Sequence, residues 1–285
     1  MDGGDLPQRG AEPAFDARGF IGRMVTALGE PCDELDPIDP EELRPVFRES
    51  PSITERAPAS GVIETGVKAV DLAVPIAKGQ RQLVLGDRVT GKSTLVLDAI
   101  LNQRGRDVIC IFCAIGKSRS AIHKALSVLK AGGALGYTAV LVAPDSAPPG
   151  EQHLVPFAAA TLGEFFVEQG RDVLVVFDDL TKHAWAYRQL SLLLARPPGR
   201  EAYPGDIFYV QTQLMERAGN FTSARGGGSM TFLGVAETQQ GDLTGYIPSN
   251  LAAMSDGQIY LDGTAFAEGQ RPAVKLGLSL SILGR

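Results

Sequence analysis

Residues 86–94 read GDRVTGKST, which fits the pattern of a glycine, four further residues and then Gly-Lys-Ser. The segment stands between the apolar run RQLVL and the helix-like segment LVLDAILNQ. Glycines at positions 86 and 91 let the backbone turn tightly, so that several amide N–H groups converge on phosphate oxygens at the start of the next helix. A glycine-rich turn with a chance Gly-Lys-Ser is the alternative, but the strand before it and the helix after it favour a phosphate-binding loop.

This loop predicts a nucleotide site that also holds a metal ion. Lys92 would add a positive charge near the terminal phosphates, and Ser93 supplies the hydroxyl group that Mg²⁺ needs. The matching acid is expected at the end of another buried strand, where VLVVFDD provides Asp178. Position alone could make Asp178 or Asp179 the N-cap of the following segment TKHAWAYRQ, and Asp179 is the better capping candidate. We therefore expect a nucleotide with Mg²⁺, the metal at Ser93 and Asp178, and nucleotide contacts from Gly86, Asp87, Arg88, Val89, Thr90, Gly91, Lys92 and Ser93.

From about residue 45 onward, apolar runs of strand length alternate with amphipathic segments of helix length. Several strand candidates are almost wholly apolar, as expected for strands covered on both faces in a mostly parallel sheet. The alternation predicts an α/β three-layer domain with right-handed crossovers over residues 45–285, after a flexible tail with at most one short strand over residues 1–44. The expected strands are RQLVLG, DVICIFCA, YTAVLVA, DVLVVFD, MTFLGVAET, GQIYL and AVKLGLSLS. The expected helices are KSTLVLDAILNQ, SRSAIHKALSVLKAG, LVPFAAATLGEFFVEQG, TKHAWAYRQLSLLLA and DIFYVQTQLMERAG, and Gly170 and Gly219 suit the ends of two of them.

Composition narrows the class of protein. The 285 residues are 44% hydrophobic, which is enough for a substantial core. The formal charge of −6 is spread along the chain without a long basic run, so nucleic acid is not expected as a main partner. The amino end is polar and acidic, and no later stretch reaches the length that crosses a bilayer, so neither export nor membrane insertion is expected.

The chain has three cysteines, Cys32, Cys110 and Cys113, and an odd number in a chain of this size indicates a reducing compartment, by default the cytoplasm. Cys110 and Cys113 form a C-x-x-C, which could indicate redox chemistry or half of a zinc site. A second ligand pair is missing, and the run DVICIFCA is strand-like, so residues three apart point to opposite faces. Two core cysteines are the favoured interpretation.

From about Gly22 to the last residue, the sequence closely resembles the alpha subunits of F-type ATP synthases, the rotary machines that couple proton flow to ATP synthesis. The block AYRQLSLLLARPPGREAYPGD is far more specific than any phosphate loop and separates the chain from RNA-translocating hexameric helicases of similar core fold. The resemblance is carried further by GRMVTALGEPCDELDPID, ETGVKAVDLAVPIAKGQRQLVLGDRVTGKST, GGGSM, AETQQGDLTGYIPSN, SDGQIYLDG and GQRPAVKLGLSLS.

The resemblance implies a RecA-like nucleotide-binding domain at the interfaces of a hexamer in which alpha and beta subunits alternate, with the gamma rotor subunit as a further partner. In that family alpha binds Mg-ATP without turning it over and beta carries the catalytic site, so no catalytic residue is expected here. An assembled subunit would be peripheral, on the cytoplasmic face of the inner membrane. Family members also have an amino-terminal β-barrel, of which this sequence retains at most the last strand, and a carboxyl-terminal helical bundle, which it lacks.

Several positions depart from the family pattern. Beta subunits place a water-activating glutamate, and alpha subunits a glutamine, where this chain has Lys117, whose ammonium is a donor and not a base at neutral pH; a solvated loop lysine is the alternative. Val89 replaces a polar glutamine that can touch the nucleotide, so weaker or altered binding is expected. The arginine finger that alpha extends into the neighbouring site becomes Ile282. Arg285 lies about 10 Å further along an extended strand and on the opposite face, so it replaces the finger only if the backbone bends.

Other family positions are kept or altered near the carboxyl end. Ser279 retains a serine that the family requires for activity, and Lys275 replaces the usual asparagine four residues earlier. Arg271 and Pro272 match a pair that lies near the purine in the family, although either could simply shape a turn. Three functions stay open: a non-catalytic nucleotide-binding subunit of an F-type or alternate rotary ATPase, a free-standing ATPase or nucleotide-gated regulator, and a degenerate copy of an alpha subunit.

Overall fold

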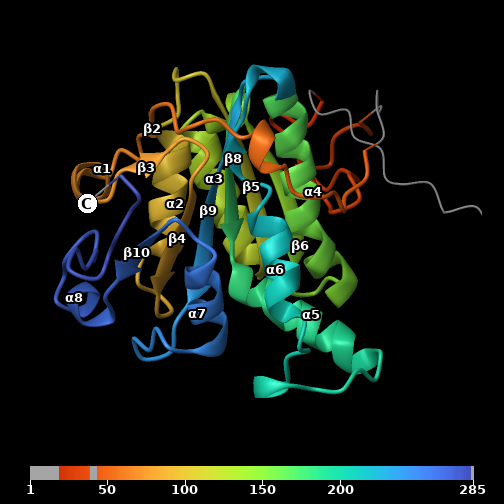
Figure 1. Ribbon diagram of the computed structural model, residues 1–285, viewed down its shortest axis with the longest axis vertical. Helices are drawn as coiled ribbons and strands as arrows, with labels where there is room; N and C mark the ends of the chain where they lie inside the picture. The colour runs from red at the N-terminus through yellow and green to blue at the C-terminus, as the bar shows by residue number, and fades with distance from the viewer. Residues whose placement is uncertain (1–18, 39–43, 284–285) are drawn as a thin grey trace, which may run out of the picture.

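The computed structural model describes residues 19–38 and 44–283, and they form an α/β fold in three layers (Figure 1). Its centre is an eight-stranded sheet with the strand order β1-β6-β5-β7-β9-β4-β10, in which β8 pairs with β9. Among the strands of the described residues, β8–β9 is the only antiparallel pair in this sheet. The strands are β1 (Met24–Val25), β4 (Arg81–Gly86), β5 (Val108–Lys117), β6 (Thr138–Pro144), β7 (Asp172–Asp178), β8 (Gly219–Asn220), β9 (Ser229–Glu237) and β10 (Gly257–Leu261), while β2 (Val62–Ile63) and β3 (Ile76–Ala77) form a small separate sheet.

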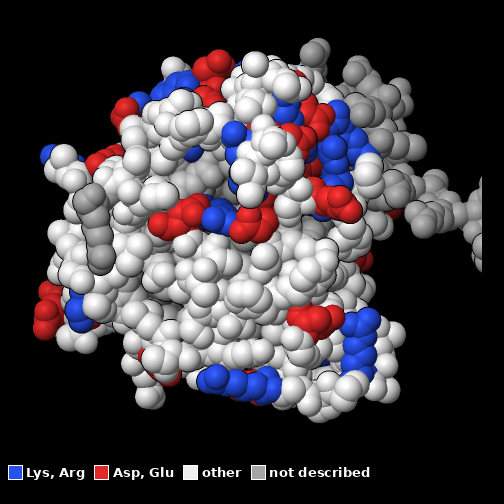
Figure 2. Space-filling model, in the orientation of Figure 1, with Lys and Arg blue, Asp and Glu red and all other residues white. Residues whose placement is uncertain are grey.

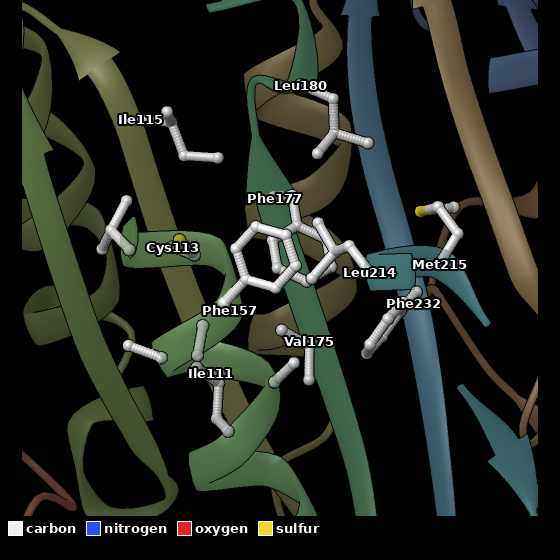
Figure 3. Packing of buried hydrophobic residues seen from close by; sticks show 14 of the residues in the cluster. Ile111, Cys113, Ile115, Phe157, Val175, Phe177, Leu180, Leu214, Met215 and Phe232 are labelled. Carbon is white, nitrogen blue, oxygen red and sulfur yellow. The ribbon is translucent and has the colours of Figure 1, made fainter. Parts of the chain in front are cut away.

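Helices cover both faces of this sheet. One core cluster joins α2 and α3 to strand residues such as Val84 and Val176, and the other joins α4, α5 and α6 to the opposite face of the same strands. Figure 3 shows the second cluster, where Phe157 of α4 and Leu214 of α6 lie over Phe177 of β7. The helices are α1 (Lys68–Ala73), α2 (Lys92–Leu101), α3 (Arg119–Ala131), α4 (Pro149–Glu168), α5 (Leu180–Leu193), α6 (Ile207–Met215), α7 (Tyr246–Ala253) and α8 (Gly263–Ala267).

The predicted fold class is confirmed: a mostly parallel sheet lies between helices, as in RecA-like P-loop domains. The expected tail strand exists as β1 and pairs with β6 at the edge of the main sheet. The division of the chain at residue 44 stays a prediction. No helix in the described part of the chain is long and apolar enough to span a bilayer.

Two local predictions were wrong. Residues 273–281 do not form a strand, because the backbone turns where the amides of Leu278 and Ser279 donate to the carbonyl of Lys275. The segment instead runs beside β10 with isolated bridges at Leu261–Val274 and Gln258–Leu280. Gly219 does not end a helix, since α6 stops at Met215 and Gly219 lies in β8.

Two other predictions were right. Gly170 follows α4 with φ of 79°, the left-handed conformation that suits glycine there. Cys110 and Cys113 are buried in β5 and belong to the core clusters on opposite faces of the sheet. Burial raises the pKa of both thiols, so they are inert core residues and not a reactive pair.

A histidine pair, partly buried at His153 and fully buried at His183, joins α4 to α5 on the face opposite α2. His153 and His183 stack with ring centroids 5.0 Å apart, and His183 Nε2 lies 3.1 Å from His153 Nδ1. Burial lowers the pKa of His153 to about 4 and that of His183 to about 3. Both imidazoles are therefore neutral in the folded protein at pH values where they are protonated in the unfolded chain.

This pair makes stability pH-dependent. The folded pKa values lie below the unfolded value near 6.5, so the unfolded state binds more protons between about pH 4 and 6.5. The free energy of unfolding should fall with decreasing pH in that window by about 1 kcal/mol per pH unit and histidine. The double variant His153→Gln/His183→Gln should lose this part of the slope in urea denaturation from pH 7.5 to 5. His123→Gln, on an exposed position of α3, should keep it; an unchanged slope in the double variant would contradict the assignment.

Candidate nucleotide-binding site

The glycine-lysine-serine loop connects β4 to α2 and has little steric freedom. Gly91 is the N-cap of α2 and adopts φ of 93°, a left-handed conformation that glycine adopts most easily. A Cβ atom added at Gly86 would lie 2.7 Å from the carbonyl oxygen of Leu261, so this position also needs glycine. Between them, Thr90 Oγ1 donates to the carbonyl of Asp87 at 2.8 Å. These constraints direct the loop toward the amino end of α2.

Lys92 is buried inside this loop. Its Nζ donates to the carbonyl oxygens of Gly86 at 2.8 Å and Asp87 at 2.5 Å. Burial lowers the pKa of Lys92, and the carboxylates of Glu237 and Asp179 oppose that shift only in part. The Lys92 ammonium therefore lies at the N-terminus of α2, where helices attract phosphate groups. Because its charge is poorly solvated, it can interact favourably with an anion.

Two adjacent acids close the site from β7. Asp178 ends the strand, and its Oδ2 accepts a hydrogen bond from Ser93 Oγ at 2.7 Å. Asp179 caps α5 by accepting from the amide of Lys182 at 2.8 Å, which confirms the predicted N-cap. Burial raises the pKa of Asp179 to about 7, although the Lys117 ammonium acts in the opposite direction.

Lys117 points into the site from the end of β5 and is not a solvated loop residue. Its Nζ lies 2.6 Å from Asp178 Oδ1, 3.9 Å from Asp179 Oδ2 and 3.5 Å from Ser93 Oγ. Burial acts to lower the pKa of Lys117, but the carboxylates of Asp178 and Asp179 outweigh it and raise that pKa above its usual value. The residue is therefore a fixed positive charge beside the expected metal ligands.

The side chains expected to hold a metal fit that role in chemistry but are already engaged. The Ser93 hydroxyl and the Asp178 carboxylate are hard oxygen ligands of the type that Mg²⁺ prefers, and they are adjacent as predicted. Both carboxylate oxygens of Asp178 have partners, Ser93 on one side and Lys117 on the other. Within residues 19–38 and 44–283 no group of three or more His, Cys, Asp or Glu side chains could hold a metal ion.

A cleft of about 1020 Å³ extends from the loop to the segment after α8. There the Arg271 guanidinium lies 3.4 Å from the centre of the Phe266 ring, and Arg271 Nη1 donates to the Phe266 carbonyl at 2.7 Å. The cleft includes the predicted contact residues Arg88, Val89, Thr90, Gly91, Lys92, Ser93, Arg271 and Pro272. Gly86 and Asp87 do not line it; Asp87 Oδ1 instead accepts from Thr238 Oγ1 at 2.6 Å.

Glu237 and Phe266 are among the cleft residues that sequence reasoning missed. Glu237 ends β9 and pairs with Arg88, its Oε2 lying 3.1 Å from Nε. The signal was available, since Glu237 follows the apolar run MTFLGVA just as Asp178 follows VLVVF. Phe266 had no such signal, because it stands in the short helix α8 that the pattern did not predict.

Two other candidates near the carboxyl end, Ser279 and Ile282, do not line the cleft. Ser279 Oγ donates to the Lys275 carbonyl at 2.9 Å and accepts from the amide of Tyr260 at 3.0 Å, so the serine fixes the turn beside β10. Ile282 is 65% exposed and shares a small hollow with Arg81 and Asp256, which lie at or just before the starts of β4 and β10. It therefore lies at the opposite end of the sheet from Gly86. Arg285 is outside the described residues.

Together, the parallel sheet, the constrained loop and the converging Lys92, Ser93 and Asp178 define a P-loop nucleotide-binding domain. Residues 66–281 match the nucleotide-binding domain of the ATP synthase alpha/beta family, and the chain belongs to that family. It is 50% identical over 266 residues to ATP synthase subunit alpha 1 of Psychromonas ingrahamii, covering 93% of this chain and 51% of the relative. It is 49% identical to subunit alpha of Dehalococcoides mccartyi strain 195 over 94% of this chain and 53% of that protein. The chain thus spans about half the length of the curated relatives it matches.

Replacing Lys92 tests the loop directly. Lys92→Ala removes the buried ammonium and should weaken ATP and ADP binding about 10- to 100-fold, the usual effect of losing a hydrogen bond to a charged group. Isothermal titration calorimetry gives the dissociation constants. The control Lys130→Ala lies on the exposed side of α3 and should bind like the parent protein. Equal affinity in Lys92→Ala would show that nucleotide binds elsewhere.

Proposed function

We propose that this chain binds ATP or ADP at a non-catalytic site and acts as an alpha-like subunit beside beta subunits in the catalytic head of an F-type ATP synthase. The observation that carries the proposal is that the site has the side chains that bind phosphate but a lysine where a catalytic carboxylate would be needed. The loop presents Lys92 and Ser93 to phosphate, while Lys117 occupies the position from which the family's catalytic subunits supply a carboxylate. Binding is supported and water activation is not.

Hydrolysis needs a group that orients or deprotonates the attacking water. Lys117 cannot accept a proton while its ammonium is paired with Asp178, and the acids raise its pKa further. Glu237 is another carboxylate in the cleft, and it is paired with Arg88. Ser93 and Asp178 would hold Mg²⁺ where the metal enters with the nucleotide.

The surface offers room for neighbouring subunits. Figure 2 shows that the face over α6 and α7 carries few charged residues. Apolar and aromatic side chains are exposed close by, with Leu193 at 77%, Leu194 at 67% and Tyr209 at 63% exposure. A face with few charges beside exposed apolar side chains is available to a partner. We propose beta subunits as the main partners and the gamma subunit as a further one, which would place the assembled chain peripherally on the cytoplasmic face of the inner membrane; outside a complex it would be cytoplasmic.

Ile282 favours a second candidate. Its position at the far end of the sheet suits a residue lent to a neighbour, yet an isoleucine cannot stabilise the charge that an arginine finger would. A nucleotide-gated regulator or a degenerate alpha copy would not need that arginine, so the change would not affect its function. Co-assembly with beta subunits separates these functions from the first.

The proposal predicts no ATP turnover by the purified chain. Phosphate release measured with saturating ATP and Mg²⁺ should stay at the rate of buffer alone, because the site holds a paired lysine where a base is needed. Phosphate release that is well above this background and disappears in Lys92→Ala would overturn the non-catalytic assignment. Glu237→Gln would then test whether Glu237 supplies the base.

Assembly is tested by mixing the chain with purified beta subunits and separating the products by size-exclusion chromatography. A ring species containing both chains is expected in ATP with Mg²⁺ or in ADP. Leu193→Glu puts a charge on an exposed apolar position at the end of α5 and should reduce the ring fraction, whereas Lys130→Glu on α3 should not. Failure to co-elute under every nucleotide condition would rule out the subunit role and favour the regulator or the degenerate copy.

A further inference from the structure

Lys117 lies at an irregular end of β5, and its side chain extends toward the loop. The pairing of β5 with β6 shifts register between Ile115 and Lys117, and Gly116 adopts φ of 59°. A Cβ atom at Gly116 would lie 2.9 Å from Lys182 Cβ, so the backbone passes close to α5. At this irregular end of the strand, Lys117 Nζ lies 2.6 Å from Asp178 Oδ1 at the end of the neighbouring β7.

The Lys117 ammonium contacts the groups that a bound metal ion would contact there. It lies 2.6 Å from Asp178 and 3.5 Å from the Ser93 hydroxyl, the two groups expected to hold Mg²⁺. Its side chain is 22% exposed, against 4% for Asp178 and 1% for Asp179. The cation paired with both buried acids is thus the Lys117 side chain, which is part of the protein itself.

A magnesium ion needs oxygen ligands at about 2.0–2.1 Å in octahedral order and keeps several of its waters. An ammonium 3.5 Å from Ser93 Oγ occupies part of that volume, and it would repel a divalent ion placed between the same groups. Lys117 and the metal are thus alternatives in this site unless the lysine side chain leaves.

The same ammonium can serve a phosphate. Lys117 lines the cleft together with Lys92 and Ser93, so two ammonium groups border the space next to the loop. An ammonium has three donors, and the pairing with Asp178 leaves donors for an oxygen of the ligand. The acids that hold Lys117 also prevent it from turning toward solvent.

We propose that Lys117 is a tethered cation that takes the place of Mg²⁺, so that this site binds ATP or ADP without a divalent metal. The inference rests on the proposed nucleotide binding and concerns which cation accompanies the phosphates. Lys117 is a binding residue in this scheme and not a catalytic one.

Calorimetric titration of the full chain with ATP and with ADP, in EDTA and in excess Mg²⁺, tests the inference without measuring turnover. The dissociation constants of the parent protein in the two conditions should agree within about threefold. Lys117→Gln removes the charge and keeps a polar side chain; it should bind at least about tenfold more weakly in EDTA and recover when Mg²⁺ is added. Lys130→Gln should behave like the parent protein in both buffers.

The possible failures are distinguishable. Binding by the parent protein only in Mg²⁺ overturns the tethered cation and leaves nucleotide binding intact. Equal affinity of Lys117→Gln and the parent protein in EDTA overturns it as well. No binding in either buffer overturns the proposed function and this inference with it. Thermal unfolding of each variant shows that it is folded, and the comparison in the parent protein needs no variant.

Discussion

Parallel pairing of β4, β5, β7 and β9 is the constraint on which the site depends. Parallel strands end at the same edge of a sheet, so the residues that finish these strands meet although they are far apart in the sequence. The loop after Gly86, Lys117, Asp178 and Glu237 all reach the site in this way. Helices packed on both faces keep the strands in register, and the core therefore determines the geometry of the charges.

Those charges depend on one another. Asp178 and Asp179 are almost fully buried, and a buried carboxylate is costly unless a cation or hydrogen-bond donor lies near it. Lys117 supplies the cation, Ser93 and the start of α5 supply donors, and Lys92 is held by loop carbonyls. The result is a site that offers positive charge to an anion and in which Asp178 and Glu237 are both paired with cations.

The two ends of the sheet have different tasks. The carboxyl ends of the strands hold the loop and its cleft, while the opposite end carries Ile282 among Arg81 and Asp256. Ile282 therefore lies at the far end of the sheet from the loop of its own chain. Under the proposed subunit role, the substitution at 282 affects a neighbouring subunit's site, whereas Lys117 affects the proposed ligand of this chain.

The sequence by itself determined the fold class, the loop and the capping role of Asp179, because these follow from local pattern: apolar runs, glycine spacing and an acid before a helix. It also placed Cys110 and Cys113 on opposite faces, since strand alternation is local. It misjudged residues 273–281, whose alternating apolar residues resemble a strand but follow a turn beside β10. It left Lys117 undecided between a loop and the site, and it did not find Glu237 or the fully buried Arg217, which is held by Glu164. Only the tertiary structure decided these, because the distance between two charged side chains depends on how the strands and helices are arranged. That arrangement brings together residues more than 50 positions apart in the sequence, as with Lys117 and Asp178 or Glu164 and Arg217.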